Sequence, residues 1–407
     1  MKYFVARPGL AFFALTAAAT LTACAKLVQP RSALPDLRPA PKVVTAQSLM
    51  ARFVSLGTSN SQGAQSAGIS PAGQHTTWPA QLALRAGVPY DIPLLQNPGC
   101  NPPLIPPLAL NLALVAAFGD DLVNAIMTSC APLRSGVTLP ASNLAISGAN
   151  AWDALHSTIE SVQHPSARKA ELYRRVLLPG QTQVTAMLTK QPTFVSVELA
   201  ANEVLPASTG RIDAMTPFNQ WQPVYDTILG AVKSTGAGAV LVGLPNNAAN
   251  FPSIRSAREL YDLWPYLLVL GISVSEKCSS SSNYLFIPGY LLSLLAETPT
   301  TATCADVAGE ADFVLTSSDM SAINSLMAAM NAHIQAKASA NGWAYFSLSA
   351  LYDLPKPALN VFDMLLSTSP FGPNISLDGV HPSAQGQAIL AAAAAQAINA
   401  KYGVSIP

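Results

Sequence analysis

The chain has 407 residues, of which 50% are hydrophobic and 11% are charged, and its 22 lysines and arginines balance 22 aspartates and glutamates. A chain of this length can form one large domain or two ordinary ones with a substantial core. The balanced charge excludes an electrostatic footprint for nucleic acid, and the hydrophobic composition excludes a disordered protein. We therefore expect a globular protein whose partner is small and uncharged, or apolar.

The first 23 residues predict an export signal. Lys2 and Arg7 supply positive charge, residues 10–21 form an apolar run too short to span a membrane, and Thr22 and Ala23 precede Cys24. The pattern resembles a bacterial lipoprotein signal. This resemblance implies cleavage before Cys24, a lipid on that cysteine, and an exported protein anchored at a membrane of the cell envelope. An ordinary secretory signal has the same charge and small-residue pattern and remains the alternative.

A proline-rich segment at residues 24–46 follows the signal. It contains four prolines and no apolar periodicity, which predicts a semi-rigid, extended tether between the membrane and the folded body. Residues 47–407 then form the predicted domain.

The first predicted element of this domain is a buried strand at residues 53–56. The strand breaks at Gly57 into small polar residues, so that Ser59 is exposed in the turn. Open α/β sheets bind ligands in the crevice at the carboxyl ends of their strands. Ser59 is therefore a candidate nucleophile, although strand-turn-serine patterns are common and this one could be an ordinary turn.

The rest of the chain alternates between strand and helix patterns, which predicts a mainly parallel sheet with helices on both faces. Proline- and leucine-rich residues at about 88–140, and an irregular stretch at about 250–316, interrupt this alternation as two long insertions. Further strands are expected at residues 143–148, 193–199, 239–244 and 343–348, and helices at residues 77–87, 152–190, 210–235, 318–340 and 382–402.

Four cysteines follow the signal: Cys100, Cys130, Cys278 and Cys304. They form no C-x-x-C pair and lie near no histidine cluster, so a zinc site is not expected, whereas an even number in an exported chain predicts disulfides. Three connectivities are possible. We favour Cys100–Cys130 and Cys278–Cys304, because each bridge would then staple one of the two insertions.

A loop directly before the last predicted helix contains Asp378 and His381, three residues apart. This spacing lets the carboxylate turn back toward one imidazole nitrogen while the other nitrogen faces outward. An acid and a histidine in this arrangement are the orienting acid and the general base of a serine triad. A helix-capping loop would have the same residues, and remains the alternative.

Four short blocks in this order resemble those of the SGNH, or GDSL, hydrolases: Gly57-Thr58-Ser59, Gly148, Ala200-Ala201-Asn202-Glu203 and Asp378-x-x-His381. The resemblance covers the mature chain apart from the two insertions. It implies a three-layer α/β/α fold with a mainly parallel, flavodoxin-like sheet, and Ser59, His381 and Asp378 as nucleophile, base and orienting acid. It further implies an oxyanion hole made by the backbone of Ser59 and Gly148 and the Asn202 amide, with no metal or cofactor.

Three residues depart from the family pattern. Thr58 and Glu203 replace the usual aspartates, and Ala200 replaces a glycine. None of them is a triad or oxyanion position, so the expected chemistry is unchanged. The departures concern how the Ser59 turn and the Asn202 loop are positioned.

The resulting expectation is a lipid-anchored serine hydrolase that cleaves small-molecule or lipid esters through an acyl-enzyme. The leucine-rich insertions favour longer acyl chains, because apolar pockets are built from such segments. Open alternatives are a polysaccharide O-acetyl esterase and a non-catalytic binding lipoprotein on the same fold. An α/β-hydrolase is disfavoured, because Gly57-Thr58-Ser59-Asn60-Ser61 lacks the second glycine of the G-x-S-x-G elbow.

Overall fold

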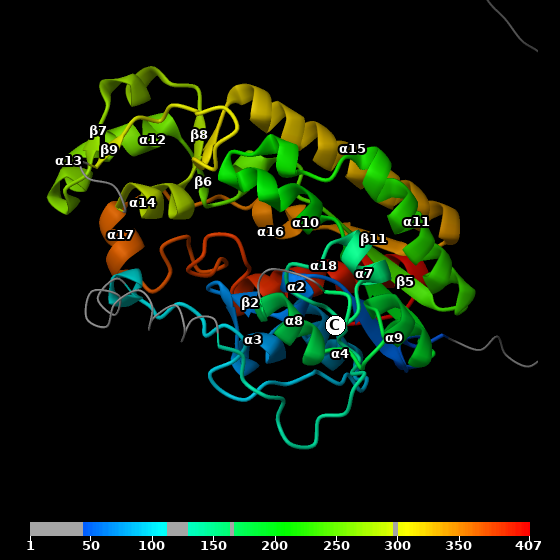
Figure 1. Cartoon of the computed structure of the whole chain (residues 1–407). Coiled ribbons are helices and arrows are strands. Elements are labelled where there is room, and N and C mark those ends of the chain that lie inside the picture. The colour runs from blue at the N-terminus through cyan, green and yellow to red at the C-terminus, as the bar shows by residue number, and fades with distance from the viewer. Residues whose placement is uncertain (1–43, 112–128, 163–166, 296–299) are drawn as a thin grey trace, which may run out of the picture. The chain divides into compact units, whose positions relative to one another are not determined.

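A computed structural model of the protein describes residues 44–111, 129–162, 167–295 and 300–407 (Figure 1). The predicted signal, Cys24 and most of the predicted tether lie outside these residues.

A parallel sheet of four strands forms the centre of the domain. Its strands are β1 (Phe53–Leu56), β4 (Phe194–Val197), β5 (Gly238–Gly243) and β11 (Ala344–Ser347), hydrogen-bonded in the order β1-β4-β5-β11. Every neighbouring pair is parallel, with Ser55 opposite Ser196 and Ser196 opposite Val240. These strands confirm four of the five that the sequence predicts.

The fifth predicted strand, at residues 143–148, is only partly formed. The segment runs parallel to β1 through the bonds from Ser55 N to Ser142 O (2.9 Å), Leu144 N to Ser55 O (3.0 Å) and Ile146 N to Gly57 O (3.1 Å), but it makes a single β-bridge. It pairs on one side only and turns away at Gly148, so no regular strand develops. With this segment as the second element in the chain, the spatial order is the flavodoxin-like 2-1-3-4-5.

Helices cover one face of the sheet with α7 (Ala151–His156), α9 (Gln183–Thr189), α11 (Phe218–Ser234) and α15 (Ser317–Asn341). The single helical region expected at residues 152–190 is in fact α7, α8 (Ala167–Arg174) and α9. The helical region is interrupted between α8 and α9 by Pro179 and by Gly180, which has φ +72°. The helices expected at 210–235 and 318–340 correspond to α11 and α15.

The opposite face is covered by α1 (Ala46–Leu49), α4 (Trp78–Ala86), α16 (Ser349–Tyr352) and α18 (Ala384–Tyr402). Successive side chains of a strand point to opposite faces of the sheet, so that Val195 packs on one face and Phe194 on the other. The predicted α4 is confirmed with its caps: the Thr77 hydroxyl accepts from Ala80 N, and Gly87 is left-handed. The domain is thus a three-layer α/β/α fold.

The second insertion is more regular than the sequence suggests. An antiparallel sheet joins β6 (Ile254–Ser256), β8 (Tyr284–Phe286) and β10 (Val314–Leu315), and this region has an apolar core of its own (Figure 1). The strands are too short and too interrupted to show a clear alternating pattern. Around them lie α12 (Ala257–Asp262), α13 (Trp264–Leu267), β7 (Ser273–Val274), α14 (Ile287–Leu295), β9 (Thr301–Ala302) and α17 (Val361–Leu366).

The remaining elements are short. They are α2 (Ser59–Gln62), β2 (Ala64–Gln65), β3 (Gly68–Ile69), α3 (Pro71–His75), α10 (Ala201–Val204) and the 3-10 helices η1 (Leu205–Thr209), η2 (Ile212–Ala214), η3 (Ala248–Asn250), η4 (Leu268–Leu270) and η5 (Glu276–Ser280).

Both favoured disulfides are present. Cys100 is bonded to Cys130 in the first insertion, and Cys278 to Cys304 in the second. Three of these cysteines are buried. Each bridge closes a loop within one insertion, which restricts the unfolded chain and stabilises the fold by about 2–4 kcal/mol.

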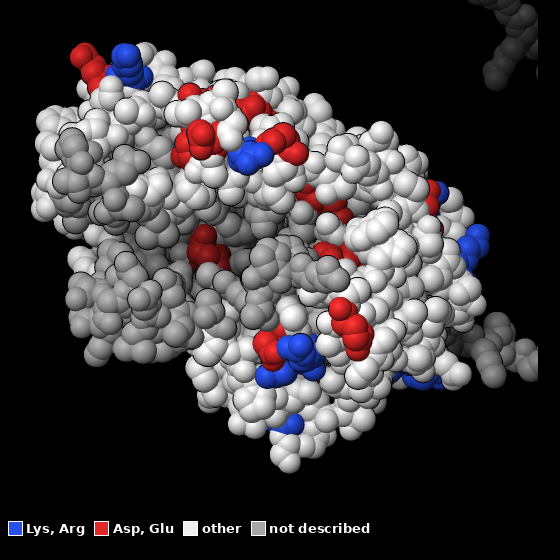
Figure 2. All heavy atoms as spheres, in the orientation of Figure 1, with Lys and Arg blue, Asp and Glu red and all other residues white. Residues whose placement is uncertain are grey.

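The surface carries few charges. On the face drawn in Figure 2, lysine, arginine and acidic side chains are scattered among uncharged ones. Of the helices within the described residues, none has both the length and the apolar composition needed to cross a membrane.

Candidate active site

Ser59 begins α2 directly after the turn that ends β1. A Cβ atom at Gly57 would lie 2.7 Å from the Cβ atom of Ser61, so only glycine lets the chain turn this tightly. Ser59 is 7% exposed, and its hydroxyl has no hydrogen-bond partner among the described residues. The strand-turn-serine pattern thus places this hydroxyl at the end of the first strand of the sheet, but the serine is buried and not exposed as the sequence predicts, because all four residues of α2 pack inside the domain.

The turn is held by Glu198, a buried acid at the end of β4. Its carboxylate accepts hydrogen bonds from the Thr58 backbone (3.0 Å), the Thr58 hydroxyl (2.8 Å) and the Ser61 hydroxyl (3.0 Å). Burial raises the pKa of Glu198 above its ordinary value, although these bonds act in the opposite direction. An aspartate at position 58 would repel Glu198, whereas threonine donates to it.

The sequence analysis missed Glu198. Glu198 could have been noticed as the acid within the apolar run of residues 194–199. A carboxyl group that is buried in such a run needs hydrogen-bond partners. Thr58 replaces the usual aspartate of the family pattern, and Glu198 provides the acid that holds the same turn.

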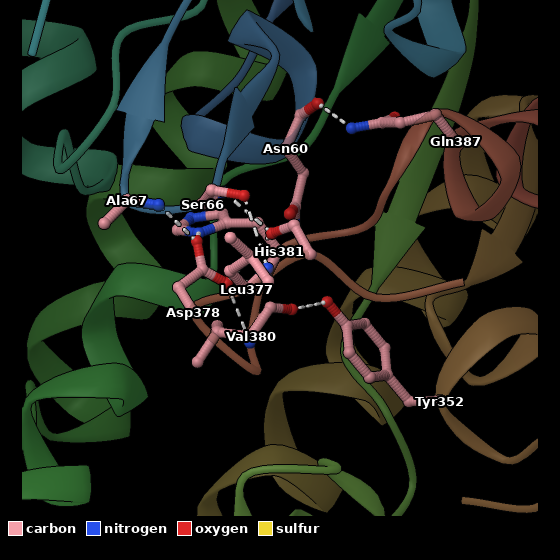
Figure 3. Close-up of polar contacts among 10 residues, drawn as sticks. Asn60, Ser66, Ala67, Tyr352, Leu377, Asp378, Val380, His381 and Gln387 are labelled. Atoms are coloured by element: carbon pink, nitrogen blue, oxygen red, sulfur yellow. Dashed lines mark hydrogen bonds and ion pairs between the residues drawn. The ribbon is translucent and has the colours of Figure 1, made fainter. Parts of the chain in front are cut away.

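Asp378 and His381 are joined as the sequence predicts (Figure 3). Asp378 Oδ2 lies 2.8 Å from His381 Nδ1, so that the carboxylate accepts from this nitrogen, and Nε2 has no hydrogen-bond partner among the described residues. Asp378 Oδ1 also accepts from the backbone N–H groups of Val380 (2.9 Å) and His381 (2.8 Å). The two side chains are 12% and 17% exposed. The carboxylate is thus held in place by its own loop and faces one imidazole nitrogen.

A hairpin that follows Ser59 by a few residues also holds the acid. At its tip between β2 and β3, Ala67 N donates to Asp378 Oδ2 (2.7 Å) and Ser66 N donates to Ser376 Oγ (2.8 Å), as Figure 3 shows for Ala67. Ser66 and Ala67 have φ +52° and +61°, which turn their N–H groups toward the loop. Residues 59–69 therefore both carry the serine and fix the position of the acid.

Three further hydrogen bonds hold the segments on either side of the histidine. Gln387 of α18 donates to Asn60 O (2.9 Å) and accepts from Trp78 N (2.8 Å), which ties α18 to the residue after the serine. The Tyr352 hydroxyl donates to Val380 O at 2.5 Å. Figure 3 shows the Gln387–Asn60 and Tyr352–Val380 bonds.

The electrostatics of Asp378 and His381 favour a charged carboxylate beside a charged imidazolium over two neutral side chains. Burial acts to raise the pKa of Asp378, but the charge and hydrogen bonds of His381 outweigh it and hold this pKa at about 2. Burial acts to lower the pKa of His381, but the charge and hydrogen bond of Asp378, with the field of Glu198, hold it above its ordinary value. The imidazole is therefore a stronger base than a free histidine.

Ser59, Asn202 and His381 line one cavity, which we call the serine cavity. Its volume is about 70 Å³, and most of its other lining residues are apolar. The structure thus brings the predicted nucleophile, base and amide donor to one cavity, with Asp378 behind the base. No hydrogen bond joins Ser59 to His381 in the described structure. In unliganded sites such bonds often form only with substrate bound.

Gly148 lies in the next loop but does not line the serine cavity. It is exposed, has φ +77°, and its N–H has no partner among the residues described. The loop is held from both sides: Ser147 N donates to Gln62 Oε1 (2.6 Å), and the Asn202 amide donates to Ala149 O (2.7 Å). These bonds connect Gly148 to the segments that carry Ser59 and Asn202.

Glu203, the other departure from the family pattern, also binds this region. It is 1% exposed, and its Oε1 accepts from Ala151 N at 2.7 Å, while Oε2 has no partner among the described residues. Burial raises the pKa of Glu203 to about 7. Glu203 therefore couples the Asn202 segment to the start of α7.

No group of His, Cys, Asp and Glu within the described residues is arranged to hold a metal ion.

The raised pKa of Glu203 predicts a pH-dependent stability. Between the ordinary pKa of 4.5 and about 7, the folded protein retains a proton that the unfolded chain loses. The stabilisation is thus fully present below 4.5 and is lost as the pH rises through 7, by up to about 3 kcal/mol. In Glu203→Gln this loss should disappear. Urea unfolding at pH 5 and pH 8 measures it.

The control for this experiment is Glu276→Gln, which changes an exposed acid in η5. It should show the same pH dependence as the unchanged protein. Equal pH dependence in Glu203→Gln would contradict a buried, protonated Glu203.

No protein-family model matches the chain, and no curated protein sequence matches it. Several solved structures do. They include an acetyl-xylooligosaccharide esterase from Geobacillus stearothermophilus, with 11% identity, 86% of this chain and 93% of that chain covered, and a TM-score of 0.33. A GDSL-like lipase from Parabacteroides merdae has 10% identity, 86% and 96% coverage, and a TM-score of 0.34.

A third similar structure is phospholipase A1 from Streptomyces albidoflavus, with 16% identity, 86% and 99% coverage, and a TM-score of 0.32. The strands have the flavodoxin-like order that the resemblance to the SGNH, or GDSL, hydrolases implies.

Proposed function

We propose that the protein hydrolyses carboxylic esters, with Ser59 as nucleophile, His381 as general base and Asp378 as the acid that orients it. The observation that carries this proposal is the arrangement around the serine cavity: a serine and a histidine line the same cavity, and the imidazole is held from behind by a carboxylate at 2.8 Å. Such an arrangement activates a serine that is otherwise a weak nucleophile.

The proposed reaction has two stages. Ser59 Oγ forms a bond to the ester carbonyl carbon and passes its proton to His381 Nε2; the bond to the alcohol oxygen then breaks, and this oxygen takes the proton. Water next attacks the acyl-serine with His381 again as base, which releases the acid and restores the serine. The free Nε2 and the bound Nδ1 of His381 suit both transfers.

Charge on the carbonyl oxygen would be stabilised by nearby donors. Asn202 lines the serine cavity and uses its amide for one bond, to Ala149 O, which leaves an N–H available. The backbone N–H groups of Ser59 and Gly148 lack partners in the described structure and are the other two candidates. Each such donor is worth about 3–4 kcal/mol in the transition state.

A fluorophosphonate probe tests the proposal most directly, because it reacts covalently with activated serines. We expect labelling at Ser59, identified by peptide mapping, together with hydrolysis of a nitrophenyl ester series. A protein that is not labelled and hydrolyses no ester would be a binding protein on this fold. Labelling with activity on O-acetylated polysaccharides alone would support the acetyl esterase alternative.

We also propose that the protein is exported and anchored through Cys24. The motif before this cysteine supports the proposal, and so do the disulfides Cys100–Cys130 and Cys278–Cys304, because disulfides persist in oxidising compartments outside the cytosol.

Cys24→Ser should therefore release the protein from the membrane fraction or leave its precursor uncleaved, because the lipid has no other attachment point. Fractionation and mass spectrometry of the N-terminus provide the measurement. Unchanged cleavage and membrane association in the variant would instead favour an ordinary secretory signal.

A further inference from the structure

A second cavity opens on the other side of His381. We call it the insertion cavity, because Leu104 and Leu108 of the first insertion and Ile272 and Leu291 of the second line it, together with Leu365 of α17. Its volume is about 460 Å³, against about 70 Å³ for the serine cavity. Its lining is almost entirely apolar.

The two cavities share a wall. Leu205, Ser208, Phe286, Val380 and His381 line both of them. Of the described residues, Ser59 and Asn202 line only the serine cavity, and Asp378 lines only the insertion cavity. His381 is thus the only member of the proposed catalytic group that borders both spaces.

This division separates the two halves of an ester. The carbonyl carbon must meet Ser59 and its oxygen must meet the Asn202 amide, so the acyl group belongs in the serine cavity. The alcohol oxygen must take its proton from His381 Nε2 as it leaves, so the alcohol belongs on the side of His381 that lacks the oxyanion donors. Building on the proposed function, we propose that the insertion cavity binds the alcohol portion of the ester.

The sizes of the cavities indicate what each half looks like. The insertion cavity has a volume of about 460 Å³ and the serine cavity one of about 70 Å³, so the larger half of the substrate fits in the insertion cavity. The substrate therefore combines a short acyl group with a large alcohol. This differs from the long acyl chain that the leucine-rich insertions suggest in the sequence.

The lining also defines the chemistry of the alcohol. No lysine or arginine occurs among the described residues that line either cavity, and the Asp378 carboxylate is occupied by donors from its own loop and from Ala67. The Asn111 amide is likewise occupied, by Ile105 and the Leu108 carbonyl. Besides His381, the described polar side chain of the insertion cavity that has no hydrogen-bond partner is Ser208, so an anionic or hydroxyl-rich alcohol would lose most of its bonds to water without replacement. The alcohol is therefore uncharged and apolar, as in the acetate or propionate of a long-chain alcohol.

Two matched ester series test this assignment. One fixes the acyl group as acetyl and lengthens the alcohol from ethyl to decyl; the other fixes the alcohol as ethyl and lengthens the acyl group equally. We expect kcat/KM to rise along the alcohol series by up to about fourfold per methylene. Along the acyl series it should stop rising, or fall, at a shorter chain length than along the alcohol series, because the serine cavity is the smaller of the two. A rise along the acyl series with none along the alcohol series would overturn the proposal.

A pair of neighbouring leucines on α17 provides a matched substitution. Leu365 lines the insertion cavity, whereas Leu366 is 63% exposed and does not line it. Leu365→Trp should lower the ratio of kcat/KM for decyl acetate to that for ethyl acetate at least tenfold, and Leu366→Trp should leave it unchanged. Leu104→Trp is the second variant if Leu365→Trp does not fold. An unchanged ratio in both filled variants would contradict the assignment.

The outcomes separate this inference from the proposed function. If no ester of either series is hydrolysed and the fluorophosphonate probe does not label Ser59, the hydrolase proposal itself is wrong. If both series are hydrolysed and labelling occurs, but chain length matters equally on both sides, only the assignment of the cavities is wrong.

Discussion

Ser59→Ala and His381→Ala should each lower kcat for ester hydrolysis by about 10⁴- to 10⁶-fold. Without the Ser59 hydroxyl no acyl-enzyme can form, and without His381 no base takes the hydroxyl proton. Because the two act as one unit, the double variant should be no slower than either single variant. Initial rates with a nitrophenyl ester and labelling by the fluorophosphonate probe measure the effect.

The chain offers a matched control for His381. His333 Nε2 lies 2.8 Å from Asp226 Oδ1, which reproduces the histidine-carboxylate pair between α11 and α15 and away from the serine cavity. His333→Ala should therefore retain turnover. Circular dichroism and thermal unfolding establish that the inactive variants are folded. A folded Ser59→Ala protein with full turnover would show that the hydrolase proposal is wrong.

Asp378→Asn should lower kcat/KM by about 10⁴-fold, the size of effect known for the orienting acid of a serine triad. The reason is the hydrogen bonding of the carboxylate. If the amide keeps its oxygen toward the N–H groups of Val380 and His381, its NH₂ group faces His381 Nδ1. Nδ1 must then accept, so the proton moves to Nε2, which can no longer take a proton from Ser59.

The same variant should change the pH dependence of the remaining activity. The base must be neutral, so kcat/KM of the unchanged protein falls as the pH drops through the pKa of His381, which Asp378 holds above its ordinary value despite burial. Removal of the Asp378 charge lowers this pKa, so the acid limb of the profile should move to lower pH. Asp226→Asn should leave the limb in place. If Asp378→Asn left the acid limb of the kcat/KM profile at the same pH, a group other than His381 would control that limb.

The sequence alone determined the elements with strong local signals. The apolar run at 53–56, the capped helix α4 and the alanine-rich C-terminal helix α18 each end at a glycine, and the structure has all three. The spacing of Asp378 and His381 likewise fixed their contact, because three residues in one turn leave little conformational freedom. For the cysteines the sequence favoured one of three possible pairings, and the structure has that one.

Tertiary structure decided what depends on segments far apart in the chain. Glu198 holds the Ser59 turn across 140 residues of sequence, and Ala67 holds Asp378 across 311, and no local pattern encodes either contact. The small sheet within residues 250–316 also escaped prediction, because its strands are stabilised by partners distant in sequence and not by their own periodicity. The division of space into two cavities around His381 depends on both insertions at once. Packing of this kind is a property of the assembled fold, and the sequence specifies it only through that fold.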